Sequence, residues 1–414
     1  METTNKVYPE RSRRELRTTN SKALACVTTA KGTGAISSIQ VVGPSAGEII
    51  KKIFIPTGRR EADFGVGDIS IGDILDGPQV IDQVVVGCEG PDNFAINCHG
   101  NPIIVEMIMK LLKKHGAQPA GIRQMLTQQL APDDKSNTIA LEAKPAQLEA
   151  VTLEGVKIIA NQARTGLGKI AGDWLANIHS LALGDIARQC EQIIADSKTA
   201  DLIINGCKVV IAGPANSGKS TLLNCLSGRD KAIVAETAGT TRDWVTGKCR
   251  TGRLLIELID TAGLDEDLSA STQIGREAQL RAVKLLAHCD LVLFVLDGSK
   301  TIRNEQLKTK RDLLKGKKVL VVFNKLDLGL KLDESQLNLD FAVSFGISAK
   351  SGDGIERLLE EIRELLGVGK FDLNSPVCFT QRQLALLELT SRTEGRSQAE
   401  AVITELLSGP IAAR

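Results

Sequence analysis

Residues 213–220 read Gly213-Pro214-Ala215-Asn216-Ser217-Gly218-Lys219-Ser220, which fits the pattern G-x-x-x-x-G-K-[ST]. The apolar run before them, 208–212, predicts a strand, and 221–226 predicts a helix. Between a strand and a helix, backbone N–H groups of such a loop converge on phosphate groups at the helix N-terminus. The segment therefore predicts a phosphate-binding loop in an α/β nucleotide-binding domain.

The residue types of this loop fit the chemistry of a bound triphosphate. Gly213 and Gly218 leave room for the phosphates, and Lys219 reaches the β and γ phosphates as a point charge. The Ser220 hydroxyl is a predicted Mg²⁺ ligand. We expect nucleotide contacts from Asn216, Ser217, Gly218, Lys219, Ser220 and Thr221. A chance glycine-rich turn is the alternative, and three further motifs argue against it.

The second motif, Asp260-Thr261-Ala262-Gly263, follows a strand-like run at 254–259. P-loop NTPases place a Mg²⁺-linked carboxylate at this position, followed by residues that approach the γ-phosphate. We therefore expect Asp260, Thr261, Ala262 and Gly263 to contact the nucleotide, and Gly263 to take part in catalysis.

The third and fourth motifs predict the base that is bound. Asn324-Lys325-Leu326-Asp327 follows a strand-like run at 318–323, and the Asp327 carboxylate can accept hydrogen bonds from the N1–H and 2-amino groups of guanine. Adenine lacks this pair of donors, so discrimination of ~10⁴-fold is expected. Ser348-Ala349-Lys350 is predicted to complete the base pocket.

A polar segment at 236–243 lies between the first two motifs and is the predicted switch segment, which closes on the γ-phosphate and Mg²⁺. Thr237, Thr240 and Thr241 are its candidate nucleotide contacts. Thr241 is also the predicted second protein ligand of Mg²⁺ and, with Lys219 and Gly263, a predicted catalytic residue. The four motifs in this order predict a GTPase.

The composition is that of a soluble chain with two or three domains: 414 residues, 43% hydrophobic, with 51 basic and 50 acidic side chains. No run of 18 apolar residues and no signal-peptide pattern occurs, so we expect a cytoplasmic protein without a membrane segment. The nine cysteines contain no C-x-x-C pair and are interpreted as reduced, packed thiols. Cys98-His99 looks like a metal-binding pair, but a zinc site needs four ligands, so we expect a structural role.

Hydrophobic periodicity divides the chain into further regions. Residues 1–20 are a predicted disordered basic tail, which is either a plain solvated end or a contact for RNA phosphates. Residues 21–121 mix strands (23–28, 35–42, 80–86) with helices (46–53, 102–114) and predict a small α+β domain. Two long helices are expected over 145–198, and a single returning helix over 381–407, packed on them.

The predicted fold is therefore multidomain. A P-loop GTPase α/β domain at 205–369, with a mostly parallel sheet and helices on both faces, is inserted in a helical domain formed by 122–204 and 375–414. The small α+β domain precedes them.

This arrangement resembles the tRNA-modification GTPase MnmE (TrmE) family over most of the chain. The resemblance rests on the loop at 213–220, on Ala238-Gly239-Thr240-Thr241-Arg242-Asp243, on 260–264, on Ile274-Gly275 with Glu277, and on Arg382-Gln383. In the N-terminal part it rests on 32–36, Gly43-Pro44 and Cys98-His99-Gly100.

The resemblance implies a GTPase in which K⁺, held by the P-loop Asn and by switch-segment carbonyls, supplies positive charge at the transition state. Asn216 stands at the position of that ligand, although an Asn there can also serve only as a turn former. The family's Glu before the Arg-Ile-Gly segment, which orients the attacking water, is replaced by Thr272. We therefore expect slower hydrolysis, unless Glu266 or Asp267 substitutes for that Glu.

The resemblance further implies a folate one-carbon donor, tRNA as a candidate partner, a flavin-dependent partner protein and a homodimer formed through the N-terminal domain. Folate binding is not expected here, because Gln40 and Ala95 replace the family's Arg and Glu. The family's C-terminal Cys motif does not appear before Arg414. The leading hypothesis is a GTP-hydrolysing enzyme linked to wobble-uridine modification; the alternative is a GTP-dependent switch or scaffold that has lost the RNA chemistry.

Overall fold

The structure is a computed structural model, and it describes residues 22–30, 32, 34–58, 63–129, 137–228, 245–260, 285–301, 316–331 and 344–409. The chain divides into two compact units, residues 1–131 and 132–414. In the described part of the chain, no helix is both long enough and apolar enough to cross a membrane.

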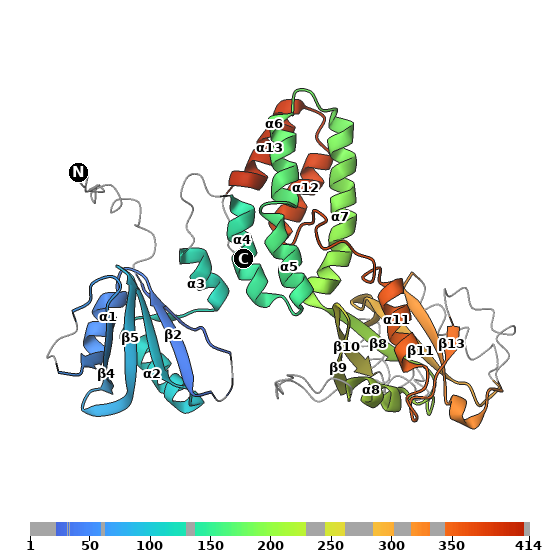
Figure 1. The fold of residues 1–414 in the computed structure, drawn as a ribbon, viewed down its shortest axis with the longest axis horizontal. Helices are drawn as coiled ribbons and strands as arrows, with labels where there is room; N and C mark the ends of the chain where they lie inside the picture. The colour runs from blue at the N-terminus through green and yellow to red at the C-terminus, as the bar shows by residue number, and fades with distance from the viewer. Residues whose placement is uncertain are drawn as a thin grey trace, which may run out of the picture. The chain divides into compact units, whose positions relative to one another are not determined.

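Unit 1 is an α+β domain built on a seven-stranded sheet in the order β3-β4-β5-β6-β2-β1-β7 (Figure 1). All of its strand pairs are antiparallel except β1 with β7. Its elements are β1 (Leu24–Val27), β2 (Ile36–Val42), α1 (Ala46–Ile53), β3 (Phe54–Pro56), β4 (Ile69–Asp76), β5 (Gln79–Gly90), β6 (Asn93–His99), α2 (Pro102–Lys114), β7 (Gln118–Pro119) and α3 (Ile122–Gln129).

The core of unit 1 lies under one face of this sheet. Helices α1 and α2 bury residues such as Ile50 and Leu112 against Ile74, Val86 and Ile96. On the opposite face, Met125 of α3 packs with apolar residues of β1 and β2. Both helices were predicted with their observed bounds, whereas β3, β4, β6 and β7 were not predicted, because their short or half-exposed runs lack a clear apolar alternation.

Unit 2 combines a helical bundle with a six-stranded sheet of order β13-β12-β11-β8-β10-β9, in which only β9 pairs antiparallel. Its described elements are α4 (Thr138–Glu149), α5 (Leu153–Gln162), α6 (Leu167–Ala176), α7 (Leu183–Asn205), β8 (Cys207–Ala212), α8 (Lys219–Ser227), β9 (Val245–Thr251), β10 (Leu254–Asp260), β11 (Leu291–Asp297), β12 (Val319–Asn324), the 3₁₀ turn η1 (Leu326–Leu328), β13 (Ser344–Gly346), α11 (Ile355–Leu365), α12 (Gln381–Ser391) and α13 (Arg396–Ser408).

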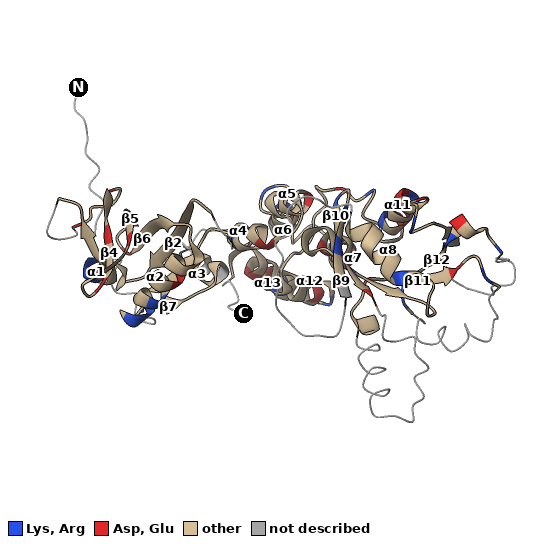
Figure 2. Ribbon diagram, turned by 90° about the horizontal axis from the view of Figure 1, so that it is seen from below, with Lys and Arg blue, Asp and Glu red and all other residues tan. Residues whose placement is uncertain are grey.

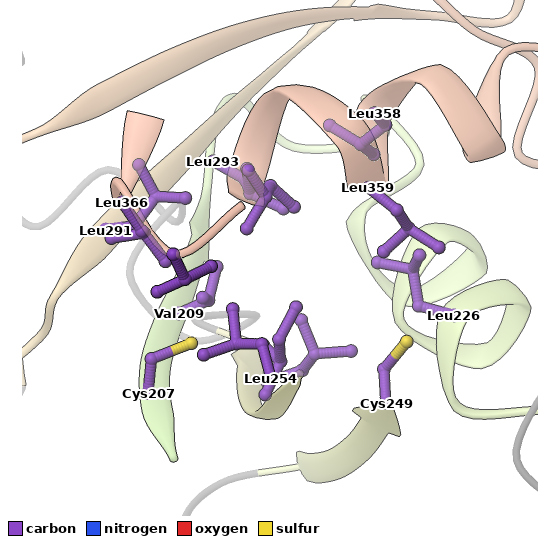
Figure 3. Close-up of a cluster of buried hydrophobic side chains, with 14 of the residues drawn as sticks. Cys207, Val209, Leu226, Cys249, Leu254, Leu291, Leu293, Leu358, Leu359 and Leu366 are labelled. Carbon is purple, nitrogen blue, oxygen red and sulfur yellow. The ribbon is translucent and has the colours of Figure 1, made fainter. Parts of the chain in front are cut away.

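The parallel strands are buried on both faces, as parallel sheets require. Alternate residues of β11 face opposite sides: Leu293 packs towards α8 and α11, and Phe294 towards the side that holds Leu286. Figure 3 shows the first side, where Leu226 of α8 and Leu359 of α11 approach the side chains of the strands. The exposed residues of α11 are acidic or basic, namely Glu356, Arg357, Glu360 and Glu364, and Figure 2 shows red and blue on this helix. This burial holds the carboxyl ends of β8, β10, β11 and β12 at one edge.

The prediction of two long helices over 145–198 is wrong. Four helices, α4 to α7, cover 138–205, and the chain turns between them. Thr152 starts α5 by accepting a hydrogen bond from Gly155 N (2.9 Å), and Asn161 O accepts one from Gly166 N (2.9 Å) in the turn before α6. Caps and turns end α4, α5 and α6 after 12, 10 and 10 residues, although the apolar spacing continues across them.

The returning segment is likewise two helices rather than one. The chain turns at Arg392–Gly395, so that α12 packs along α7 while α13 packs against α6 and α4. Leu387 of α12 and Ile403 of α13 are buried in one core with Trp174 of α6. A single straight helix could not pack along α7 and also return against α6 and α4.

Candidate functional site

The loop between β8 and α8 approaches neighbouring strands so closely that its glycines have no substitute. Gly213 has φ +148°, and a Cβ there would lie 2.0 Å from the Val295 carbonyl oxygen. Gly218 has φ +92°, and a Cβ there would lie 2.2 Å from Asn324 Nδ2. These positions need glycine both for the backbone conformation and for space.

Helix α8 begins at Lys219 with its first turn free of a capping side chain. Gly218 occupies the N-cap position and makes no side-chain cap bond. The first N–H groups of a helix have no partner within it, and such groups bind anions. Lys219 is only 6% exposed, and its Nζ donates to the carbonyls of Gly213 (3.1 Å) and Pro214 (3.0 Å), so the ammonium is folded under the loop.

Ser220 and Asp260 meet at the second motif. Ser220 Oγ donates to Asp260 Oδ2 at 2.7 Å, because β10 and β8 are parallel neighbours and Asp260 pairs with Ile211 just before the loop. Asp260 is 1% exposed, and its Oδ1 is a buried oxygen without a hydrogen-bond partner among the described residues. A hydroxyl beside a carboxylate with an unmatched oxygen suits a hard cation or its water shell.

Asn324 joins three of the four motifs. Its Nδ2 donates to the Ser217 carbonyl (3.0 Å), and its Oδ1 accepts from the Lys325 N–H (2.8 Å) and the Ala349 N–H (2.9 Å). The side chain is buried at 2% exposure. Asn324 therefore sets the distance between the phosphate loop and the predicted base pocket.

The base-pocket residues lie together at the ends of β12 and β13. Asp327, exposed on the 3₁₀ turn η1, accepts a hydrogen bond from Ser348 Oγ at 2.8 Å, which orients the carboxylate. Ser348 and Ala349 are buried, whereas Lys350 is exposed. The two carboxylate oxygens of Asp327, which could accept hydrogen bonds from a base, therefore lie at the same edge of the sheet as the loop at 213–218, which could bind phosphates.

Asp297, at the end of β11, belongs to this group, although the sequence analysis did not predict it. Its Oδ2 accepts from Lys325 Nζ at 2.8 Å, and the same ammonium donates to the Asn216 carbonyl at 2.5 Å. Burial acts to raise the pKa of the Asp297 carboxyl, but hydrogen bonds from Lys325 and Ser299 outweigh it and hold the pKa below its ordinary value. The sequence does carry a signal for Asp297, because it is the acidic residue that ends the otherwise apolar run 291–296.

The remaining predicted residues are either exposed or outside the described residues. Asn216 and Thr221 are exposed on the loop and on α8. Some predicted positions lie outside the described residues: Thr237, Thr240, Thr241, Thr261, Ala262, Gly263 and Thr272. Cys98 is buried in the core of unit 1, and the neighbouring His99 pairs with Asp82 (2.7 Å) rather than with Cys98.

Comparisons with known proteins cover both units. Residues 208–325 match the family described as 50S ribosome-binding GTPase, and residues 23–122 match the family described as GTP-binding protein TrmE N-terminus. The chain is 30% identical over 392 residues to the tRNA modification GTPase MnmE of Bacteroides thetaiotaomicron, covering 84% of this chain and 82% of that protein. It is 30% identical over 408 residues to the MnmE of Lactobacillus delbrueckii subsp. bulgaricus, covering 90% and 87%.

Identity of this extent spans the helical bundle as well as the two matched segments, so the resemblance inferred from the motifs is confirmed. The multidomain fold class is confirmed as well: an α+β N-terminal domain, a P-loop GTPase domain with a mostly parallel sheet, and helices on either side of it in the sequence. The chain is a GTP hydrolase that belongs to the tRNA modification GTPase MnmE family.

Proposed function

We propose that this GTPase binds Mg²⁺·GTP at the edge formed by β8, β10, β11 and β12, and that it serves the modification of wobble uridine in tRNA. The observation that supports the proposal most directly is the Asn324 side chain, which ties the loop at 213–218 to Lys325 and Ala349. A guanine held by Asp327 would then lie at a set distance from phosphates held by the loop.

Within this proposal Lys219 binds the β and γ phosphates, and the N-terminal N–H groups of α8 bind them from the same side. Ser220 and Asp260 are the described residues that fit Mg²⁺, through the hydroxyl and the unmatched Asp260 Oδ1. Mg²⁺ would neutralise charge that develops on the phosphate oxygens. Thr241 and Gly263 stay predictions for the switch side of the site.

We assign Asn216 as the side-chain ligand of K⁺. It is exposed at the tip of the loop, and its backbone is held at φ +60°, which L-residues rarely adopt. Asn tolerates this conformation better than most residues, and its amide oxygen is a hard ligand suited to an alkali cation.

GTP hydrolysis in KCl and in NaCl at equal ionic strength tests this assignment. We expect faster turnover in KCl for the wild type, and an Asn216→Ala variant that still binds GDP but whose turnover no longer distinguishes the two salts. Asn224→Ala, on the exposed side of α8, is the matched control. Equal turnover of the wild type in both salts would refute the K⁺ role; GTP binding without turnover in either salt would favour the GTP-dependent switch, which nothing in the comparisons supports.

The link to tRNA rests on the relatives, which are tRNA modification GTPases, and is tested separately. We expect purified protein to retain tRNA, together with a flavin-dependent partner protein, in a pull-down from the cytoplasm. Cells in which Lys219→Ala replaces the wild type should lose a wobble-uridine modification, measured by mass spectrometry of tRNA nucleosides. An unchanged nucleoside profile would remove the tRNA role and leave the GTPase.

The folate donor is excluded from the proposal, because the residues present do not fit it. Gln40 Nε2 is committed to Glu89 Oε2 (2.7 Å) and to Asn93 Oδ1 (2.6 Å). Its cross-strand neighbour is Ala95, which has no polar side chain to offer a pteridine. We expect no binding of a formyl-tetrahydrofolate by calorimetry, and micromolar binding would contradict this.

A homodimer through unit 1 is supported by apolar side chains on the sheet face opposite α1 and α2. Ile55, Ile69 and Ile71 are 50%, 74% and 58% exposed, and the pairing of β3 with β4 places them on one face. Exposed apolar groups of this kind mark interfaces. Ile69→Lys with Ile71→Lys should convert a dimer to a monomer in light scattering, whereas Ile103→Lys, on α2, should not; a monomeric wild type would refute the dimer.

A further inference from the structure

Two residues of the site share an unusual backbone conformation. Among the described residues, Asn216 (φ +60°) and Lys325 (φ +71°) are the only non-glycine residues with positive φ. Such conformations persist only where the surroundings hold them in place, and they cluster at functional sites. These two residues are 109 positions apart in the sequence and are joined directly, because Lys325 Nζ donates to the Asn216 carbonyl oxygen at 2.5 Å.

The lysine that makes this contact is itself held by Asp297. Asp297 Oδ2 lies 2.8 Å from Lys325 Nζ, and the two side chains are 10% and 29% exposed. Oδ1 accepts from the Ser299 N–H (3.1 Å) and from Ser299 Oγ (2.6 Å), so the carboxylate cannot turn without losing these bonds. A half-buried ammonium with a fixed counter-charge has one favoured position, and here that position is against Asn216.

The sheet explains why Asp297 is placed to do this. β11 and β12 are parallel neighbours in register, with Asp297 opposite Asn324. The residue after Asp297 continues the contact, since Gly298 N donates to the Asn324 carbonyl at 2.8 Å. Asp297 therefore lies beside Asn324, the first residue of the predicted base-recognition segment 324–327. Lys325 of that segment extends to the phosphate loop.

We infer that Asp297 is a positioning residue that couples the guanine pocket to the monovalent-cation site. By holding Lys325 on the Asn216 carbonyl, Asp297 sets the backbone conformation that aims the Asn216 side chain at the cation. The inference rests on the K⁺ role of Asn216 proposed above. Because coupling between two sites is reciprocal, K⁺ and guanine nucleotide should each strengthen the binding of the other through this contact.

The test compares Asp297→Asn with the wild type in two measurements. The first is the K⁺ concentration that gives half-maximal GTP hydrolysis at saturating GTP; the second is the affinity for a fluorescent GDP. The variant keeps the shape of the side chain but removes the charge that holds Lys325. We expect the half-saturating K⁺ concentration to rise at least about fivefold, the lower end of typical couplings between sites, and GDP binding to weaken.

Lys300→Gln is the matched control. Lys300 Nζ lies 3.7 Å from the same Asp297 oxygen, but the side chain is 68% exposed. Its removal changes the charge beside Asp297 without touching the Asn216 contact. We expect both measured values to stay within about twofold of the wild type, because exposed ion pairs contribute little.

The outcomes separate the inference from the function on which it rests. Wild type without K⁺ stimulation refutes the K⁺ role itself and the coupling with it. Wild type with K⁺ stimulation and an unchanged half-saturating K⁺ concentration in Asp297→Asn refutes the coupling alone, even if GDP binding weakens. Should Asp297→Asn fail to fold, judged by its thermal melt, Ser299→Ala replaces it in the test. A rise in the half-saturating K⁺ concentration beyond the twofold range of the control, up to about tenfold for one lost hydrogen bond, supports the coupling, and a value within that range refutes it.

Discussion

The side-chain amide of Asn324 donates to the backbone carbonyl of Ser217 at 3.0 Å, across 107 residues of sequence. This bond ties the phosphate loop to the strand that ends at the base pocket. Asn324→Ala would leave the Ser217 carbonyl and the Ala349 N–H without this partner. An unsatisfied buried group costs about 1–3 kcal/mol, so we expect GDP affinity to fall by about tenfold or more. Calorimetric titration with GDP measures it, and unchanged affinity would show that the loop holds its place without Asn324.

Asp327→Asn should change the base that is bound. In the proposed site the Asp327 carboxylate would accept from guanine N1–H and the 2-amino group, and an amide would turn one acceptor into a donor. We expect GTP affinity to fall by ~10²-fold or more, while a triphosphate of xanthine, which has a carbonyl at that position, regains affinity. Competition against a fluorescent GDP compares the two nucleotides. Retained preference for guanine would place base recognition on other residues.

Gly213→Ala should abolish nucleotide binding. The added Cβ would lie 2.0 Å from the Val295 carbonyl, so that the loop must move away from β11. Gly172→Ala, in helix α6 with open space around it, is the matched control and should raise stability by about 0.5–1 kcal/mol, since alanine favours helix. Fluorescent GDP binding and urea unfolding of both variants give the comparison. Nucleotide binding by Gly213→Ala at wild-type strength would contradict the close approach.

Glu142→Ala should destabilise the helical bundle strongly. Glu142 accepts from Arg382 Nε at 2.7 Å and from the second guanidinium nitrogen at 2.9 Å, with both side chains below 10% exposure. Removing one partner of a buried pair costs about 3–5 kcal/mol, because the other charge stays buried. Urea unfolding measures this loss.

The exposed pair Asp185 and Arg188 on α7 supplies the control for this experiment. Asp185→Ala should leave the urea midpoint nearly unchanged, since exposed pairs contribute little. Arg382 also donates to the carbonyls of Glu405 and Leu406, so Glu142→Ala should speed amide exchange at the end of α13. Equal midpoints for the two alanine variants would show that the buried pair does not stabilise the bundle.

The free energy of unfolding should fall at alkaline pH, because the buried thiol of Cys190 ionises less readily in the folded protein than in the unfolded chain. Burial, with a smaller contribution from the charge of Glu191, raises the pKa of Cys190 to about 12. Between the ordinary thiol pKa and this value, the unfolded chain loses a proton that the folded protein keeps, so stability decreases as pH rises, by at most about 1.4 kcal/mol per pH unit. Urea midpoints from pH 8 to 11 should decline less steeply in Cys190→Ala than in Cys225→Ala; equal slopes would rule out this contribution.

The four nucleotide motifs could be predicted from the sequence because each is local. A glycine-bounded loop before a helix, or an aspartate after an apolar strand, carries its chemistry within a few residues, and the parallel order of the strands brings their ends to one edge. Helices such as α1 and α2 were predictable for the same reason, since their apolar spacing repeats every turn. The breaks between α5, α6 and α7 were not, because caps and turns interrupted a periodicity that continued across them.

The sequence by itself determined the positions of the phosphate loop and of the aspartate predicted to select guanine, because these depend on residue types at short, fixed spacings. Only the tertiary structure decided that Asp297 holds Lys325 against Asn216, and that Glu142 and Arg382 form a buried pair between α4 and the returning helices. These contacts join residues far apart in the chain, and they exist because sheet register and helix packing bring the side chains within hydrogen-bond distance.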